Sequence, residues 1–299
     1  SETRVIAPKR VGEFDFVASH YDEKYKLSGA QIRYAHPRYP ALRFDVFVYP
    51  IGKMPQDEAI KRGMRDFRAN LDAVVKTGFF RDFKIVATDP FEIRPTPPPQ
   101  PKSEASKIEA SAAAETPATS VEAVKTAETA ETAEPMQEKK KSLSDDQIKT
   151  LIGLAPIKGE RMTLSYRTED KDAGGEVAMR SRGYLFYKQL YFFKGRISAT
   201  ESEIDEAAFS EIADRAMREL IPAIKAHNIG ACGQTTIAIN PDAPKERMME
   251  EMTKAMTDAM TRTAEDNCDT SFDAHEYAQL RETAEIVGIE YTPQDWGGQ

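Results

Sequence analysis

The sequence lacks the residue patterns that most often carry chemistry. Its 299 residues include only four His, two Cys and one Trp. The histidines have no H-x-x-x-H or H-x-E spacing, and the chain contains no G-x-G-x-x-G, no P-loop and no G-x-S-x-G elbow. We therefore predict no metal, no cofactor and no catalytic residue. The alternative is an enzyme of unfamiliar type that uses Cys232 or a histidine (His20, His36, His227, His275).

Long apolar runs and an excess of positive charge are absent as well. The most apolar stretch, Tyr184 to Phe193, is interrupted by Lys188 and Gln189 and falls short of the ~18 residues that a membrane helix needs. The 49 acidic and 41 basic residues give a net charge of −8, which disfavours phosphate binding over a broad surface. We expect no transmembrane segment and no nucleic acid, with a protein or an envelope component as the partner.

The two cysteines, Cys232 and Cys268, stand at the ends of expected elements, where a bridge could join one element to another. A disulfide between them would stabilise the fold by roughly 3–4 kcal/mol on the loop-entropy relation. Disulfides persist in oxidising compartments, and the chain begins with Ser1 rather than Met. We therefore expect a periplasmic or secreted protein, or one that is lipid-anchored through a removed N-terminus. The alternative to the disulfide is two independent free thiols, and the alternative to a removed N-terminus is an engineered start.

Composition divides the chain into four parts. Four prolines fall within Pro97 to Pro101, and no aromatic residue occurs from Lys102 to Lys141, where Ala, Glu, Thr, Ser and Lys dominate. Such a segment buries too little apolar surface to offset its ordering entropy, so we predict a disordered linker. The parts are a first α+β half at 1–94, the linker at 95–141, a second α+β half at 142–241 and a C-terminal helical extension at 242–299.

Apolar periodicity predicts the same order of elements in both halves. The first half has expected strands at 13–19, 29–36 and 42–50, a long helix between Pro55 and Gly78, and a strand at 83–93. In the second half, a short helix at 144–154 and a strand at 161–169 precede 177–197, which is a hairpin or a bent pair with Gly183 at the bend. A capping box at Thr200 and Glu203 opens a long helix that ends at "HNIG", before a strand at 234–240.

The shared order suggests that one strand-strand-helix-strand unit occurs twice. Gly29, Tyr34, Gly52 and Gly78 have positional counterparts in Gly159, Tyr166, Gly195 and Gly230. Side-chain identity is low, so a chance resemblance between two ordinary α+β segments is the alternative. The predicted fold class is α+β, with antiparallel sheets each backed by one long helix, an internal duplication, and additional C-terminal helices.

The C-terminal part is expected to contain two helices. Met249, Met252, Met256 and Met260 lie along one side of a helix at 242–266, and a second helix is expected at 273–287 with Gly288 as its stop. Clustered thioethers could bind Cu(I), but Met also fills gaps in cores and no His or Cys joins the stripe. We interpret the stripe as packing against a core or a partner.

Arginine, lysine and tyrosine alternate in two strand regions, which is typical of a sheet face that binds an anionic partner. The candidate binding-surface residues are Arg33, Tyr34, Arg180, Arg182, Tyr184, Tyr187, Lys194 and Arg196. The alternative is that they form solvated edges of amphipathic strands.

Three functional hypotheses follow. The first is a non-enzymatic binding or assembly protein of the cell envelope, the second a small-ligand or lipid carrier with a pocket between sheet and helices, and the third the unfamiliar enzyme. An apolar pocket with a few converging polar groups would favour the carrier.

Overall fold

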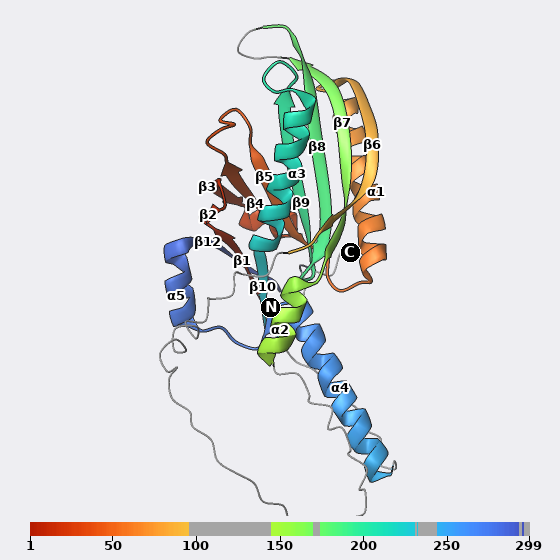
Figure 1. Ribbon diagram of the computed structural model, residues 1–299, viewed down its shortest axis with the longest axis vertical. Helices are drawn as coiled ribbons and strands as arrows, with labels where there is room; N and C mark the ends of the chain where they lie inside the picture. The colour runs from red at the N-terminus through yellow and green to blue at the C-terminus, as the bar shows by residue number, and fades with distance from the viewer. Residues whose placement is uncertain (96–144, 170–173, 231, 233–243, 293–294, 296–299) are drawn as a thin grey trace, which may run out of the picture. The chain divides into compact units, whose positions relative to one another are not determined.

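The computed structural model describes residues 1–95, 145–169, 174–230, 232, 244–292 and 295. The predicted linker at 95–141, apart from Pro95, and the predicted strand at 234–240 lie outside these residues. Within them, two β-sheets and five α-helices form the α+β fold that the sequence predicts (Figure 1).

The larger sheet has eight strands in the order β2-β3-β4-β5-β9-β8-β7-β6, and every neighbouring pair is antiparallel. The two halves meet at its centre, where Val46 of β5 lies opposite Gly195 of β9. Strands from both sides of the predicted linker therefore share one hydrogen-bonded sheet. The strands are β2 (Arg10–Val11), β3 (Phe14–Tyr21), β4 (Ala30–Ala35), β5 (Phe44–Pro50), β6 (Arg81–Ile93), β7 (Ile157–Glu169), β8 (Glu176–Lys188) and β9 (Tyr191–Thr200).

The smaller sheet joins the two ends of the chain. Its order is β11-β10-β1-β12, with β1 antiparallel to β10 and β12, and β10 parallel to the short β11. Its strands are β1 (Glu2–Pro8), β10 (Lys225–Ile229), β11 (Cys268–Asp269) and β12 (Ala284–Glu290). The sequence reading found no strand at 2–8, and it assigned "HNIG" to a helix end and Gly288 to a helix stop. Those assignments were wrong, because pairing with β1 holds these stretches extended.

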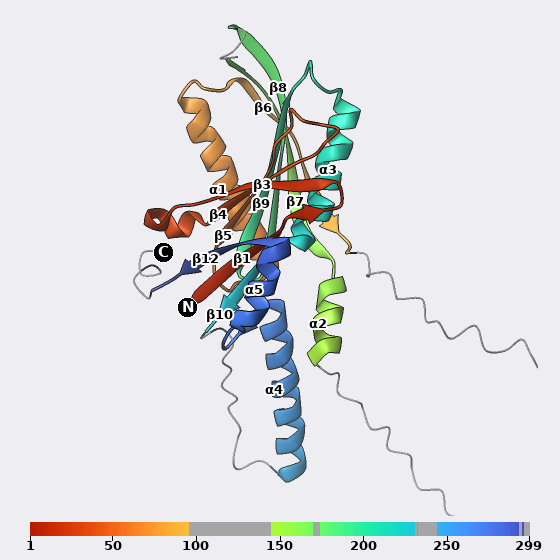
Figure 2. The ribbon, with the colours of Figure 1, turned by 90° about the vertical axis from the view of Figure 1, so that its left-hand side faces the viewer.

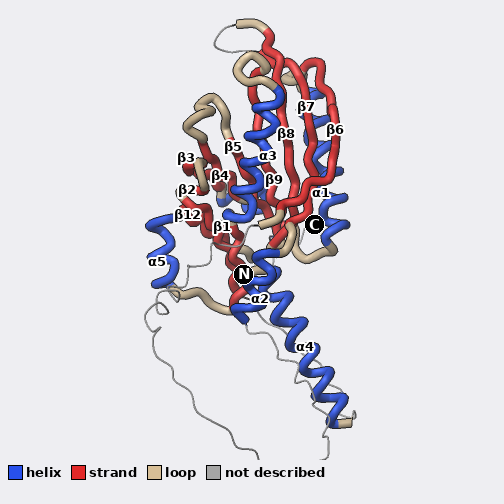
Figure 3. Tube along the Cα trace, viewed as in Figure 1, coloured by secondary structure: helices blue, strands red, loops and turns tan. Residues whose placement is uncertain are grey.

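Two long helices cover opposite faces of the larger sheet (Figure 2). The first, α1 (Gln56–Lys76), packs on β7 and β8, and the second, α3 (Glu206–Ala223), packs on β2, β5, β8 and β9. Helix α1 of the first half therefore lies over two strands of the second half. Helix α3 of the second half lies over the central pair, β5 and β9, and over β2 and β8. The remaining helices are the 3₁₀ helix η1 (Glu23–Ser28), α2 (Asp145–Leu154), α4 (Lys245–Glu265) and α5 (Ala274–Thr283), and Figure 3 shows all elements by type.

Strand alternation separates two cores. Phe44, Val46 and Val48 point into the larger core under α3, whereas Leu185 and Phe192 point into the smaller core under α1. Each helix approaches the sheet closely over a glycine. Gly183 lies under Phe67 of α1, and Gly195 lies under Met217 of α3.

The hairpin between β8 and β9 turns at Gln189 and Leu190, not at Gly183. Both turn residues have positive φ, 54° and 69°, which matches the right-handed twist of the flanking strands. Gly183 lies inside β8 opposite Arg196. The prediction of a bend there was wrong because this glycine provides space for a helix instead.

The second long helix begins later than predicted. The backbone N–H of Thr200 does donate to the Glu203 carboxylate at 3.4 Å, but this contact lies in the turn before the helix. The N-cap is Asp205, whose carboxylate accepts from the backbone N–H of Ala208 at 2.9 Å. A matching cap at Asp273 opens α5.

Candidate functional site: a cavity between helices and sheet ends

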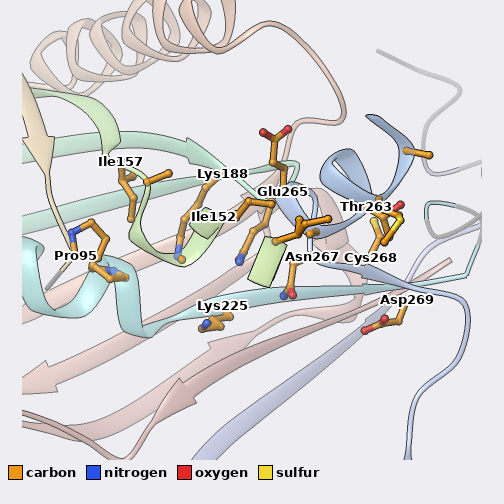
Figure 4. A pocket seen from close by; sticks show the side chains of 18 of the residues that line it. Pro95, Ile152, Ile157, Lys188, Lys225, Thr263, Glu265, Asn267, Cys268 and Asp269 are labelled. Carbon is orange, nitrogen blue, oxygen red and sulfur yellow. The ribbon is translucent and has the colours of Figure 1, made fainter. Parts of the chain in front are cut away.

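A cavity of about 650 Å³ lies where α2, α4 and the end of α3 meet the β8–β9 turn (Figure 4). Most of its wall is apolar. The apolar lining comprises Pro95, Ile148, Ile152, Gly153, Ala155, Ile157, Pro222, Met256, Ala259, Met260 and Ala264. A cavity of this size and lining is typical of small-molecule sites.

Two helices of different parts of the chain form the outer wall. Packing of α2 on α4 buries Ile148 and Ala259, and the same faces present Ile152, Met256 and Met260 to the cavity. The 3.6-residue period places Met256, Ala259 and Met260 on one side of α4. Met249, Met252 and Met256 nevertheless remain 65%, 37% and 48% exposed. The stripe was expected to pack against a core or a partner. The prediction of a core is wrong for these three residues, because α4 meets few described residues at its N-terminal end.

Lys188 supplies the most unusual charge at the cavity. Its Nζ donates to the carbonyls of Ile221 and Ile224, both at 2.6 Å, and lies 4.3 Å from the ring centre of Phe193. These carbonyls belong to the last turn of α3, so the side chain caps the negative end of that helix. Burial, together with the nearby Lys225 charge, lowers the pKa of Lys188 well below its ordinary value.

The other polar groups of the cavity divide into engaged and unengaged ones. Gln189 accepts from the backbone N–H of Ala226 at 2.8 Å, and Asn267 donates to the Ala226 carbonyl at 2.9 Å. Asp269 lies 2.6 Å from Nε2 of His227. Lys225 is exposed, and within the described parts of the chain it makes no side-chain hydrogen bond or ion pair. It is therefore the cation most accessible to a ligand.

The predicted cysteine pairing is confirmed at one wall of the cavity. Cys232 and Cys268 form a disulfide with their Cα atoms 5.7 Å apart. Cys268 is buried, lines the cavity and belongs to β11, which pairs with β10. The bridge therefore attaches the chain just beyond β10 to the segment that follows α4.

The tyrosines predicted for a binding surface lie in the interior. Tyr34 donates to the carbonyl of Pro8 at 2.7 Å, Tyr184 to Asp214 at 2.6 Å and Tyr187 to the carbonyl of Gly52 at 2.8 Å. All three are buried, so the structure contradicts their placement on an exposed face. Alternation along a strand did not reveal this, because helices cover both faces of the sheet.

The predicted basic residues are divided between the two faces. Arg182 lies under α3 and donates to Asp214 at 2.8 Å, and Arg180 lies two residues away on the same strand. Lys194 lies under α1, 3.8 Å from the ring centre of Phe67, with Arg196 two residues away on its strand. Arg33 donates to Asp45 at 2.7 Å. The structure does not bring the eight residues together as one surface.

Two of the residues proposed for an enzyme, Cys232 and His227, are engaged in structural contacts. Cys232 is in the disulfide and offers no thiolate. His227 lies between Asp269 and the hydroxyl of Tyr277, an order that resembles a proton relay. Tyr277 is buried beneath the Arg4 guanidinium, and burial raises the pKa of its hydroxyl to about 12. A hydroxyl with such a high pKa is rarely ionised at neutral pH and is therefore a poor nucleophile.

Sequence reasoning allowed for a pocket between sheet and helices but did not identify its residues, although two signals pointed to them. Lys188 interrupts an aromatic strand, where a charge requires a specific partner. Ile148 and Ile152 occur four residues apart on a short helix. Neither signal identifies the opposite wall, since α4 comes about 100 positions later in the chain.

No protein-family model, curated protein or solved structure matches this chain. Among the described residues, no helix has the length and apolarity to cross a membrane. The same residues contain no group of three or more His, Cys, Asp and Glu side chains placed to hold a metal ion.

Proposed function

We propose that the protein is a non-enzymatic binding protein that carries a small apolar or amphipathic ligand in the cavity between α2, α4 and the sheet ends. The cavity itself is the observation that supports this proposal: its volume is about 650 Å³ and its wall is mainly Ile, Met, Ala and Pro. Water forms few hydrogen bonds with such a wall, whereas a bound apolar chain would shield the wall from solvent. The disulfide supports the further proposal of a periplasmic or secreted location.

The experiment uses a neutral apolar probe, N-phenyl-1-naphthylamine, whose fluorescence rises in apolar surroundings. We expect a saturable increase with the wild-type protein. Ala259→Trp places an indole in the cavity, because Ala259 is buried in its wall, and is expected to weaken binding at least tenfold. Met249→Trp adds the same indole to the exposed part of α4, outside the lining, and should bind as the wild type does.

Thermal melts of both variants verify folding, because an overpacked α2–α4 contact could itself loosen the wall. Equal probe binding by the folded Ala259→Trp variant would contradict a ligand site in this cavity.

An assembly role is the second candidate, and the exposed methionines of α4 favour it. Met249 and Met252 lie outside the cavity lining and leave apolar surface in solvent. If α4 mediates self-association, sedimentation equilibrium should show an oligomer that Met249→Glu with Met252→Glu dissociates. A wild-type monomer at all concentrations would exclude self-assembly through this helix.

A further inference from the structure

We infer that the ligand of this cavity is an anionic amphiphile, whose head group is held by Lys225 on the side of the cavity where Lys188 lies. The inference rests on the proposed function, because it concerns the same cavity. It adds the charge of the ligand and the residues that recognise that charge.

The first observation is a pair of lysines in the lining that have no carboxylate partner. Lys188 and Lys225 both line the cavity, and Figure 4 shows them on the same side of it. They are close enough that the charge of Lys225 lowers the pKa of Lys188. In the described chain, neither lysine forms an ion pair with a carboxylate. The lining also contains two acidic residues: Asp269 is engaged with His227, and Figure 4 shows the carboxylate of Glu265 pointing away from both lysines.

The second observation is the number of free donors. An ammonium carries three N–H groups, and Lys188 uses two of them for the carbonyls of Ile221 and Ile224. The Phe193 ring lies against the same ammonium, so the donors that remain for a ligand are those of the exposed Lys225. A carboxylate or a phosphate provides several acceptor lone pairs, so it can accept a charge-assisted hydrogen bond from Lys225.

The third observation is that the cations adjoin an apolar wall. Ile152, Ile157 and Met256 line the same cavity as the two lysines. An anion alone would leave this wall in contact with water, and a neutral hydrocarbon would bury ammonium groups without compensation. A molecule with an anionic head and an apolar tail satisfies both parts of the lining. Its negative head would also favour the charged form of Lys188, which burial and the Lys225 charge disfavour.

The test compares three ligands with the same ten-carbon chain by their ability to displace N-phenyl-1-naphthylamine: decanoate, decyl phosphate and decan-1-ol. We expect both anions to compete at least tenfold better than the alcohol. Their order distinguishes a carboxylate from a phosphate head group. Each measurement is made below the critical micelle concentration of the ligand.

Two variants of Lys225 and one control variant assign the effect to this lysine. Lys225→Gln and Lys225→Glu change an exposed side chain, so folding should be retained, and we expect losses of about fivefold and at least tenfold for decanoate. Binding of decan-1-ol should not change. Lys254→Gln removes an exposed lysine of α4 outside the lining and should leave all three affinities unchanged.

The outcomes separate the two proposals. If the neutral probe does not bind the wild type, the proposed function fails and this inference fails with it. If the probe binds but decan-1-ol competes as well as the anions, or Lys225→Glu leaves decanoate binding unchanged, only the anionic head group is refuted.

Discussion

Gly183 of β8 lies directly beneath the aromatic ring of Phe67, so that a Cβ atom at position 183 would lie 2.6 Å from the ring atom Cε1. Such an approach is far inside van der Waals contact. It explains why a glycine occupies the middle of a strand, where glycine is otherwise unfavourable. It also sets how closely α1 can pack on the sheet.

We predict that Gly183→Ala lowers the free energy of unfolding by roughly 1–3 kcal/mol, because the ring or the helix must move to admit a methyl group. Urea denaturation followed by circular dichroism measures the change. Gly288→Ala is the control, because a Cβ at position 288 meets no atom within 4 Å. If both variants unfold at the same urea concentration, the contact with Phe67 does not limit the packing of α1.

The carboxylate of Asp214 on α3 joins that helix to the sheet. It accepts from Arg161 at 2.7 Å, from Arg182 at 2.8 Å and from Tyr184 at 2.6 Å. We predict that Asp214→Ala costs roughly 2–4 kcal/mol of stability, because three donors lose a partly buried partner. The control is Glu211→Ala, which removes an exposed carboxylate from the same helix. A cost of less than about 0.5 kcal/mol, measured by urea denaturation, would contradict this role.

Lys194 should make stability depend on pH in the alkaline range. Burial, and secondly the Arg196 charge, lowers the pKa of Lys194 to about 8, although its ammonium also contacts the Phe67 ring. Because the folded-state pKa is below the unfolded value of about 10.4, the folded state binds fewer protons between these values. The penalty from Lys194 is therefore complete below pH 8 and disappears as the pH rises toward 10.

We predict that the stability difference between Lys194→Met and the wild type falls by roughly 1–3 kcal/mol between pH 7.5 and pH 10. Urea denaturation at several pH values measures this difference. Lys254→Met, which changes an exposed lysine, should show a constant difference over the same range. A constant difference for Lys194→Met as well would mean that its pKa is not lowered.

The disulfide should leave neither cysteine as a free thiol and should stabilise the fold. We predict that a thiol reagent finds no reactive cysteine in the denatured, unreduced protein. Reduction, or the change of Cys232 and Cys268 to Ser, should cost roughly 3–4 kcal/mol for a loop with a sequence separation of 36. Detection of two free thiols would remove the principal support for a periplasmic or secreted location.

Local pattern predicted many individual elements, but not their partners. The helix after Pro55 and the strand at 42–50 were found because each has a clear apolar period, and the observed elements are Gln56–Lys76 and Phe44–Pro50. The strand Glu2–Pro8 was missed, although its burial alternates, because only its pairing with β10 and β12 distinguishes it from an extended terminus. The repeated unit stays a prediction, since element order is its only support.

The candidate site shows the same division. The cysteine pair needed no structure, since two cysteines allow one intramolecular pairing. The tyrosines were misplaced because alternation along β8 does not reveal that α1 and α3 cover both faces. Lys188 was visible only as an interruption of an apolar run, and its contact with the end of α3 depends on where that helix stops.

The order of residues in this chain was enough to specify its α+β class, its first long helix and its cysteine pair, because each depends on a few neighbouring side chains or on a simple count. The pairing of β5 with β9, the burial of Tyr34 and Tyr184, and the cavity at Lys188 arose only on folding. Each requires segments that are distant in the sequence to meet, and packing rather than local periodicity selects which segments do so.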